Sequence, residues 1–333
     1  MSYDAVLLIS FGGPEKREDV IPFLENVLRG RNVPHDRLLE VAEHYYHFDG
    51  RSPINDQCRD LIRMLGVEGL ELPIYWGNRN WYPMLAGTVK EMRDAGVERA
   101  LAIPTSAFGS YSGCRQYLED IDAVRNAVPN APVIDKLPPF WNHAGFIETM
   151  VDRVSKALEK LPGAQVVYTA HSIPVSMAQS SPYESQLKEA ARRVNDTLNL
   201  GEPILVYQSR SGPPTQPWLE PDVCESIRQL HAGGDLADLV LAPIGFLSDH
   251  MEVVYDLDIE AAALCRELGI NLARATTVGI HPAFVSMIRE LILERMEGRE
   301  ERRLGRAGAG RGTCGPDCCP PPKRPPVKSA EAR

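Results

Sequence analysis

The chain has 333 residues, of which 44% are hydrophobic and 24% are charged. This composition is typical of a folded globular protein and excludes a wholly disordered, collagen-like or coiled-coil chain. The length exceeds what one hydrophobic core usually supports, so we expect two domains or one large α/β unit. The net charge is −9, but residues 302–333 alone carry +6, which leaves −15 on the remainder. A body this acidic argues against a nucleic-acid partner.

Export and membrane insertion are not expected. The apolar run at residues 5–11 is too short for a secretory signal and has no basic residues before it. The longest apolar stretch, residues 239–247, contains a proline and a glycine and has about half the length of a membrane span. Seven cysteines, an odd number, favour reduced thiols or metal ligation over a disulfide framework. The predicted location is therefore the cytoplasm.

Short runs rich in Val, Ile and Leu alternate with segments of helical period. Residues 20–28, for example, repeat apolar side chains at helical spacing and end before Gly30. Repeated alternation of strand and helix predicts parallel sheets with right-handed crossovers. The predicted strands are residues 5–10, 72–77, 100–104, 165–170, 204–208 and 239–242.

The predicted strands fall into two groups. A proline-rich segment at residues 129–139 separates them, so we expect one domain at 1–150 and a second at 151–303. The last helix is expected over residues 281–303, where it could pack back on the first domain. Beyond it, residues 304–333 form a tail too rich in Pro and Gly for a packed helix or strand.

The residues that follow each strand are the first candidates for a ligand site, because ligands of parallel α/β sheets bind beyond the strands' carboxyl ends. Residues 11–14, after the first strand, contain neither G-x-G-x-x-G nor G-x-x-x-x-G-K-[ST], which argues against a nucleotide phosphate site. His171 follows the strand at 165–170, on a loop stiffened by Pro174. Taken alone, such a histidine is more often a buried or capping residue than a ligand.

A second candidate group follows the strand at 239–242. Glu252, Asp256 and Glu260 are spaced i, i+4, i+8 and would form one acidic stripe on a helix. The pattern leaves two interpretations open. One is a solvated helix face. The other is a row of oxygen ligands along which a divalent cation moves, ending at an imidazole that suits Fe²⁺. A histidine and carboxylates that face a cleft would also supply a general base.

The tail carries the third candidate group, since Cys314, Cys318 and Cys319 form a C-x₃-C-C cluster. Clusters of this density are typical of Zn²⁺ or iron–sulfur sites, which take four ligands. An unliganded tail with incidental thiols is the alternative. Among the other cysteines, Cys114 lies in a strand-to-helix loop that the tail could reach, whereas three lie within helical patterns: Cys58, Cys224 and Cys265.

Several stretches, taken in order, resemble the ferrochelatase family, which inserts ferrous iron into a porphyrin to make haem. The resemblance covers residues 3 to about 303 and implies two similar Rossmann-like domains, each a parallel sheet flanked by helices, with a porphyrin cleft between them. The stretches are residues 8–14 (LISFGGP), 28–31 (LRGR), 50–53 (GRSP), 77–81 (GNRNW), 171–174 (HSIP), 208–210 (QSR), 218–221 (WLEP) and 245–252 (GFLSDHME).

The resemblance also implies site residues. The family's invariant histidine falls on His171 and its active-site glutamate on Glu252, with Asp256 and Glu260 behind them on a helix with a π-type widening. These four residues would guide Fe²⁺ and take up the pyrrole protons. The resemblance does not indicate which of His171 and Glu252 accepts a proton and which guides the metal. Some bacterial members carry a tyrosine where this chain has Phe11, which cannot ligate iron and is expected to form an apolar wall. The expected porphyrin-binding residues are Phe11, Arg29, Arg31, Ser52 and Trp218, although the two arginines could equally serve the helix dipole.

The tail is similar to that of the actinobacterial branch, in which a [2Fe–2S] cluster is held by three late cysteines and one mid-chain cysteine. The matching ligands are Cys114, Cys314, Cys318 and Cys319, and the implied substrate is coproporphyrin III. We expect a monomer that docks transiently to neighbouring enzymes of haem biosynthesis. The alternatives are a protoporphyrin IX ferrochelatase, a chelatase for another tetrapyrrole or metal, and a non-catalytic haem or metal carrier.

Overall fold

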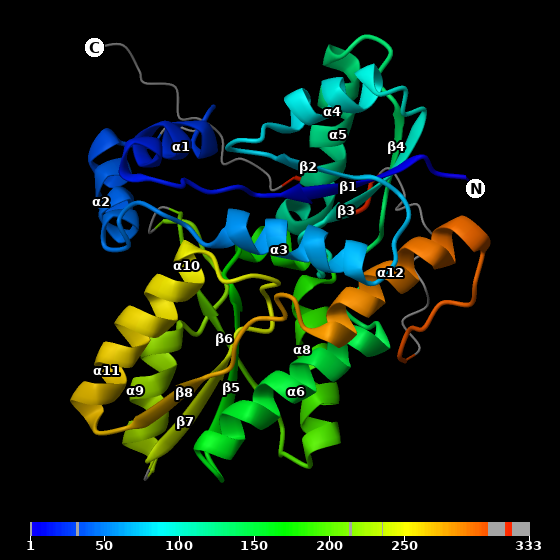
Figure 1. Cartoon of the computed structure of the whole chain (residues 1–333). Helices are drawn as coiled ribbons and strands as arrows, with labels where there is room; N and C mark the ends of the chain where they lie inside the picture. Colours follow the sequence, from blue (N-terminus) through cyan, green and yellow to red (C-terminus); the bar gives the residue numbers. More distant parts are fainter. Residues whose placement is uncertain (1, 31–32, 213–214, 235, 306–316, 322–333) are drawn as a thin grey trace, which may run out of the picture.

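Two parallel four-stranded sheets form the framework of the molecule, one above the other in Figure 1. The computed structural model describes residues 2–30, 33–212, 215–234, 236–305 and 317–321. The strand orders are β2-β1-β3-β4 and β6-β5-β7-β8, so the predicted α/β fold with two parallel sheets is confirmed. The strands are β1 (Ala5–Ser10), β2 (Ile74–Asn78), β3 (Arg99–Pro104), β4 (Val133–Lys136), β5 (Gln165–His171), β6 (Ile204–Gln208), β7 (Asp238–Ala242) and β8 (Asn271–Arg274).

Helices connect the strands and flank both sheets (Figure 1). In the first half they are η1 (Arg17–Asp19), α1 (Val20–Val27), α2 (His35–Tyr46), α3 (Ile54–Val67), α4 (Leu85–Asp94), the π-helix η2 (Tyr111–Arg115) and α5 (Gln116–Ala127). In the second half they are α6 (Ala144–Lys160), α7 (Val175–Gln179), α8 (Tyr183–Leu198), α9 (Val223–Gly233), α10 (Met251–Val253), the π-helix η3 (Val254–Ala261), α11 (Ala262–Leu268) and α12 (Pro282–Glu297). Among the described residues, we find no helix with the length and apolar character needed to cross a membrane.

The central strands are apolar on both faces because each face is covered. In β1, Leu7 packs with residues of α4 and α5, whereas Leu8 points to the opposite face and packs with residues of α3. In β5, Val167 packs with residues of α9 and α11, whereas Tyr168 faces α6 and α8. These buried runs explain why the central strands are so visible in the sequence.

The two halves share one hydrophobic core. The cluster that contains Leu8 also contains Tyr168 of the other sheet. Helix α12 lies between the halves and packs against α6 and α3. Gly145 permits this close packing, because a Cβ atom there would lie 2.8 Å from the Cβ of Met287. Position 150, near which we expect the domains to divide, lies within α6, and Met150 is fully buried.

Three details differ from the sequence predictions. Strand β4 lies inside the segment interpreted as a proline-rich linker, and β8 was not predicted. Both are edge strands that pair with one neighbour only, so neither needs a long apolar run. The last helix ends at Glu297 rather than near 303, because Gly298 adopts φ +70° and terminates it. The following segment then runs back along the body, where Leu304 N donates to Asn142 O at 2.8 Å.

Candidate active site

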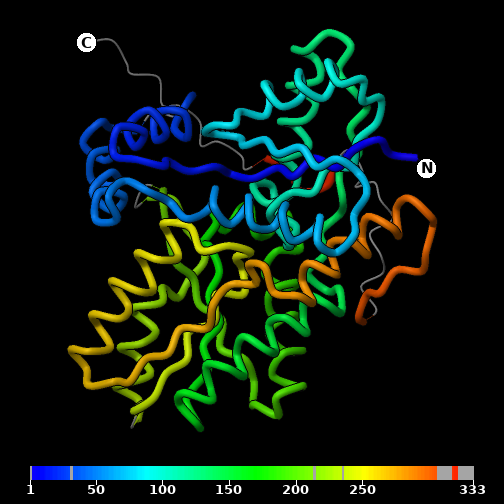
Figure 2. The backbone as a smooth tube through the Cα atoms, viewed as in Figure 1, coloured from blue at the N-terminus to red at the C-terminus, as the bar shows by residue number. Residues whose placement is uncertain are grey.

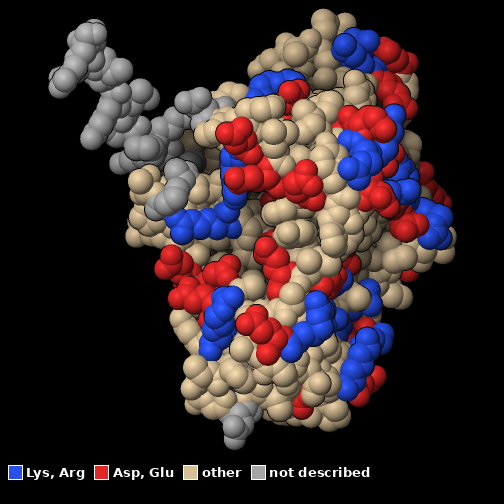
Figure 3. Space-filling model, turned by 90° about the vertical axis from the view of Figure 1, so that its left-hand side faces the viewer, with Lys and Arg blue, Asp and Glu red and all other residues tan. Residues whose placement is uncertain are grey.

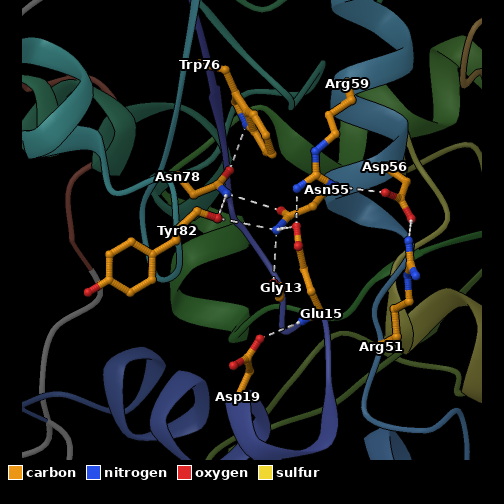
Figure 4. Close-up of polar contacts among 10 residues, drawn as sticks. All are labelled: Gly13, Glu15, Asp19, Arg51, Asn55, Asp56, Arg59, Trp76, Asn78 and Tyr82. Atoms are coloured by element: carbon orange, nitrogen blue, oxygen red, sulfur yellow. Dashed lines mark hydrogen bonds and ion pairs between the residues drawn. The ribbon is translucent and has the colours of Figure 1, made fainter. Parts of the chain in front are cut away.

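The turn after β1 is built by a buried polar network (Figure 4). Gly12 has φ +83°, and Asn55 Nδ2 donates to Gly13 O at 3.1 Å. Asn78 Nδ2 in turn donates to Asn55 Oδ1 at 3.1 Å. Ser52 is 3% exposed and lies directly under Gly13, where a Cβ atom would come within 2.7 Å of the Cβ of Ser52. Ser52 therefore packs beneath the turn rather than at its surface.

The turn presents Phe11 to solvent. The ring is 39% exposed, and its edge contacts Phe23 with ring centroids 6.1 Å apart. The carbonyl of Phe11 accepts from Asn80 N at 3.2 Å, and Asn80 O accepts from Asn26 Nδ2 at 3.3 Å. Exposed Arg29 donates to Asn26 Oδ1, so this arginine is tied to the same turn. Arg31 lies outside the described residues.

The central pair is His171 at the end of β5 and Glu252 in α10. His171 Nε2 lies 3.5 Å from Glu252 Oε2, and the two side chains are 30% and 47% exposed. His171 Nδ1 hydrogen-bonds Ser172 O, and a carbonyl can only accept, so Nδ1 carries a proton. In the neutral imidazole the lone pair is therefore on Nε2, facing Glu252. This arrangement provides a base or metal ligand beside a carboxylate.

The pair's electrostatics favour a charged glutamate. Burial alone would raise the pKa of Glu252, but the charge and hydrogen bond of His171, with His250 and His44, outweigh it and hold that pKa at about 2. Burial lowers the pKa of His171, but Glu252 and then Ser172 outweigh this effect, so the net shift is upward. Both side chains are partly exposed, but protein surrounds the exposed parts. Desolvation and neighbouring charges therefore both act on the pKa values of the pair.

The acidic row continues along η3. Asp256 Oδ2 accepts from Ser209 Oγ and, at 3.3 Å, from Gln208 Nε2, which also donates to Glu252 O at 3.2 Å. Burial raises the pKa of Asp256 to about 7; the hydrogen bond from Ser209 opposes this shift, and the charges of Glu252 and Glu260 add to it. The helical geometry here is π rather than α, as the resemblance implied.

Contacts across the two halves position this helix. Gln57 of α3 donates from Nε2 to Asp249 O at 3.3 Å and accepts at Oε1 from Asp249 N at 2.9 Å. Arg274 at the end of β8 donates to Asp249 Oδ1 at 2.9 Å and to Asp258 Oδ1 at 2.5 Å. The loop before Glu252 is thus fixed from both halves.

Two histidines near Glu252 were not assigned a role from the sequence. His250 Nδ1 lies 3.8 Å from Glu252 Oε2, and burial lowers the pKa of this histidine. The charge of His44, on α2, also acts on Glu252. His250 belongs to the stretch 245–252, which ends at Glu252, so the sequence could have indicated that the two side chains are close. The amphipathic pattern of α2 does not indicate that His44 lies near Glu252.

Trp218 lies beside the loop that carries His171. An antiparallel bridge joins Trp218 and Pro174, and Leu219 N donates to Ile173 O at 3.0 Å. The Trp218 indole Nε1 is buried without a hydrogen-bond partner among the described residues. Trp218 therefore lies beside the loop that carries His171.

The tail returns to the first half at Cys114, a buried residue of η2. Cys318 Sγ lies 3.7 Å from Cys319 Sγ, and Cys319 interacts electrostatically with Cys114. Two sulfurs on one tetrahedral metal would be about 3.8 Å apart, given metal–sulfur bonds of about 2.3 Å. Cys314, the fourth cysteine of the expected ligand set, lies outside the described residues. Within the ranges that the structure describes, no complete group of three His, Cys, Asp or Glu side chains is arranged to hold a metal ion.

Comparison with known proteins adds independent observations. The ferrochelatase family model matches residues 3–296. A ferrochelatase of Rhodopirellula baltica is 53% identical over 98% of this chain and 96% of its own length. A coproporphyrin III ferrochelatase of Nocardia farcinica is 48% identical over 98% of this chain and 99% of its own length. A coproporphyrin III ferrochelatase of Streptomyces coelicolor is 47% identical over 96% of this chain and 93% of its own length.

Solved structures support the fold alone. SirB from Bacillus subtilis with Fe³⁺ gives a TM-score of 0.57 at 14% identity, over 90% of this chain and all of that chain. CbiX, described as the terminal enzyme of sirohaem biosynthesis in denitrifying bacteria, gives a TM-score of 0.52 at 14% identity, over 86% of this chain and 97% of that chain.

Proposed function

Because the chain belongs to the ferrochelatase family, we propose that it inserts Fe²⁺ into coproporphyrin III to give coprohaem, a step of haem biosynthesis. The enzyme is a metal chelatase, and hence a lyase. The proposed porphyrin rests on relatives that are named coproporphyrin III ferrochelatases. The observation that carries the proposed mechanism is the 3.5 Å approach of His171 Nε2 to Glu252 Oε2 on two solvent-accessible side chains.

The reaction requires a base, because the porphyrin loses two pyrrole protons as the metal enters. We assign both protons, one after the other, to His171 Nε2, the nitrogen that faces Glu252; the first is passed on to Asp256 before the second is taken up. The low pKa of Glu252 keeps its carboxylate ionised, so it stabilises the imidazolium that forms and offers oxygen to the incoming Fe²⁺. Asp256, with its pKa at about 7, can gain or lose a proton near neutrality and pass it towards Glu260.

The porphyrin-binding residues are proposed from their placement. Phe11 offers an accessible apolar ring for one face of the macrocycle, and Trp218 lies beside the His171 loop. Arg29 is exposed and could pair with a propionate, and Arg31 is proposed on the resemblance alone. Ser52 is assigned a supporting position under the turn of Phe11. A rigid wall of this kind could bind a distorted porphyrin better than a flat one, which would lower the barrier.

We further propose a [2Fe–2S] cluster on Cys114, Cys314, Cys318 and Cys319. The sulfur–sulfur distance of 3.7 Å and the proximity of Cys319 to Cys114 support it. Such a cluster supplies one-electron redox chemistry when bound. Metal insertion involves no net electron transfer, so the proposed role is structural or sensory. We also propose a cytoplasmic location and a monomer, since one chain supplies every residue of the proposed site.

The proposal is tested by mixing the purified full chain anaerobically with Fe²⁺ and either coproporphyrin III or protoporphyrin IX. We expect the free-base absorption bands to collapse with coproporphyrin III, and to do so much more slowly with Glu252→Gln. Faster turnover of protoporphyrin IX would overturn the proposed substrate. Retention of haem without insertion into either free base would instead indicate a carrier.

A further inference from the structure

The side-chain amide of Gln57 pairs with the backbone of Asp249. Gln57 lies on α3 in the first half of the molecule, and Asp249 lies in the loop before α10 in the second half, 192 residues later. Gln57 Oε1 accepts from Asp249 N at 2.9 Å, and Gln57 Nε2 donates to Asp249 O at 3.3 Å. A carboxamide carries both a donor and an acceptor, so one side chain satisfies both backbone groups of one residue.

The same aspartate is held from its other side by Arg274. Arg274 Nη1 donates to Asp249 Oδ1 at 2.9 Å, and the two side chains are 17% and 20% exposed. Arg274 also donates from Nε to Asp258 Oδ1 at 2.5 Å, so it joins the loop to η3 within the second half. The backbone of Asp249 is therefore fixed from the first half, and its carboxylate is fixed from the second.

Asp249 directs the chain into Glu252. The next residue, His250, is extended, with φ −115° and ψ 178°, and α10 begins immediately after it. Val254 N donates to His250 O at 3.0 Å, which ties the start of the helix to this loop. Glu252 lies in the first turn, so a shift of the Asp249 peptide moves its carboxylate. His171 cannot follow such a shift, because it ends β5, whose central residues are buried.

A second side chain of α3 holds the turn after β1, which presents Phe11. Asn55 Nδ2 donates to Gly13 O at 3.1 Å (Figure 4). Asn55 and Gln57 are two positions apart, so they leave the helix in different directions. Leu65 of the same helix is fully buried in the core that both halves share, which keeps α3 in place. One fixed helix therefore holds both the turn after β1 and the loop before α10.

We propose that Gln57 is a positioning residue for iron insertion: it holds Glu252 at its distance from His171 by fixing the loop before α10 from the opposite half. This inference rests on the proposed function. A misplacement of about 1 Å within such a pair can slow a reaction about 10²-fold. The stack of His44 on Tyr255 also joins the halves. That stack holds the helix after Glu252, whereas Gln57 holds the chain before it.

The test compares Gln57→Met with the wild-type full chain. Methionine has nearly the length of glutamine without the amide, and Gln57 lines a small cavity together with apolar side chains such as Leu61 and Leu247, so the variant should fold. Its kcat for iron insertion into coproporphyrin III should fall about tenfold to a hundredfold. The Michaelis constant for the porphyrin should stay within about twofold, because Asn55 still holds the turn of Phe11.

The pKa of His171 provides a measurement that does not depend on activity. Burial lowers this pKa and Glu252 raises it, so a displaced Glu252 should leave it lower in Gln57→Met than in the wild type. NMR of chains labelled with ¹⁵N-histidine, titrated with pH without metal or porphyrin, measures it. Gln186→Met is the matched control, since Gln186 Oε1 accepts from Gly109 N at 2.7 Å and so also joins the two halves. This control should keep the wild-type kcat and the wild-type pKa of His171.

The outcomes separate this inference from the proposed function. Folded Gln57→Met with the wild-type kcat, or with a reduced kcat but an unchanged pKa of His171, would overturn the role of Gln57. An equal fall of kcat in Gln186→Met would also overturn it, because any lost contact between the halves would then suffice. A wild-type chain that inserts iron into neither porphyrin would overturn the proposed function, and a lower pKa of His171 in Gln57→Met would still support the positioning of Glu252. If Gln57→Met does not fold, Gln57→Asn, whose amide is one methylene too short to reach Asp249, should show both changes, and wild-type values would overturn the inference.

Discussion

His44 of α2 stacks on Tyr255 of η3, with ring centroids 3.8 Å apart and ring planes inclined by 7°. The edge of His47 approaches the same tyrosine at 6.3 Å. Tyr255 interacts electrostatically with Asp256 and Glu260, and His44 with Glu252. An aromatic contact between the two halves therefore lies directly beside the acidic row. Figure 3 views the molecule from this side and shows acidic and basic side chains interspersed over its described part.

Removing this stack should loosen α2 from the second half. We expect a double-mutant cycle of His44→Leu and Tyr255→Leu to give a coupling free energy of about 0.5–1.5 kcal/mol, the usual value for an aromatic pair. Urea unfolding of the wild type, the two single variants and the double variant measures it. Hydrogen exchange should rise in α2 but not in β1, which belongs to the buried core. Additive effects of the two substitutions would contradict the coupling.

Glu252→Gln and His171→Ala should each slow iron insertion by about 10²–10⁴, the usual contribution of a general acid or base. Because the two groups act as a unit, the double variant should be little slower than either single one. Stopped-flow absorption of the free-base porphyrin measures these rates. Glu148→Gln, an exposed glutamate of α6, is the control and should behave like the wild type. Near-normal insertion by folded His171→Ala would defeat the assignment.

The pKa of Asp256 predicts how stability depends on pH. The pKa is about 7 in the folded protein, well above that of an unfolded aspartate, so the folded state binds more protons between about pH 4 and pH 7. Asp256 therefore lowers stability as the pH rises through this window, with a slope of at most about 1.4 kcal/mol per pH unit. Asp256→Asn should be stabilising at pH 8 relative to its effect at pH 4. Urea unfolding at both pH values measures this change, and exposed Asp60→Asn, whose partner is Arg63, is the control. If Asp256→Asn changed the free energy of unfolding equally at pH 4 and pH 8, the raised pKa of Asp256 would be contradicted.

The fold was largely predictable because central strands of parallel sheets are apolar on both faces. The predicted bounds of central β1 agree with the structure to the residue. Those of β6, an edge strand, also agree, because its sequence ILVYQ is almost wholly apolar. Strands β4 and β8 were missed because they are short, lie at sheet edges and contain charged residues such as Lys136 and Arg274. Strands of four residues that include charged side chains bury little apolar surface, so their sequences carry a weaker signal than those of the apolar edge strands β2 and β6.

The site was predictable in part for a related reason. His171 follows a recognisable strand, and Glu252 opens a recognisable acidic row. The contribution of α2 could not be predicted, because His44 reaches Tyr255 and the neighbourhood of Glu252 only through packing between the two halves. Sequence spacing reports local geometry, whereas such contacts depend on tertiary structure.

The proposed cluster ligands can be separated from the structural cysteines. Cys114→Ser should abolish absorption between about 400 and 600 nm and the iron bound beyond the substrate site, since these clusters need four ligands. Cys224→Ser is the control, because Cys224 lies in α9 and burial raises the pKa of its thiol to about 12. Absorption spectra and iron analysis of the anaerobically purified chains provide the measurement. Coloured protein from Cys114→Ser would remove Cys114 from the ligand set.

Arg29→Glu should weaken binding of the porphyrin rather than slow the chemical step. A charged hydrogen bond contributes about 1.5–3 kcal/mol, so its loss should raise the Michaelis constant for coproporphyrin III about tenfold or more while kcat changes little. The effect should be smaller for protoporphyrin IX, which carries fewer propionates. Arg37→Glu is the control, since Arg37 lies on α2 and pairs with Glu40 at 2.6 Å on an exposed face. Steady-state kinetics with both porphyrins measure the difference. An unchanged Michaelis constant in Arg29→Glu would mean that Arg29 stabilises the end of α1 and the turn of Phe11 and does not bind a propionate.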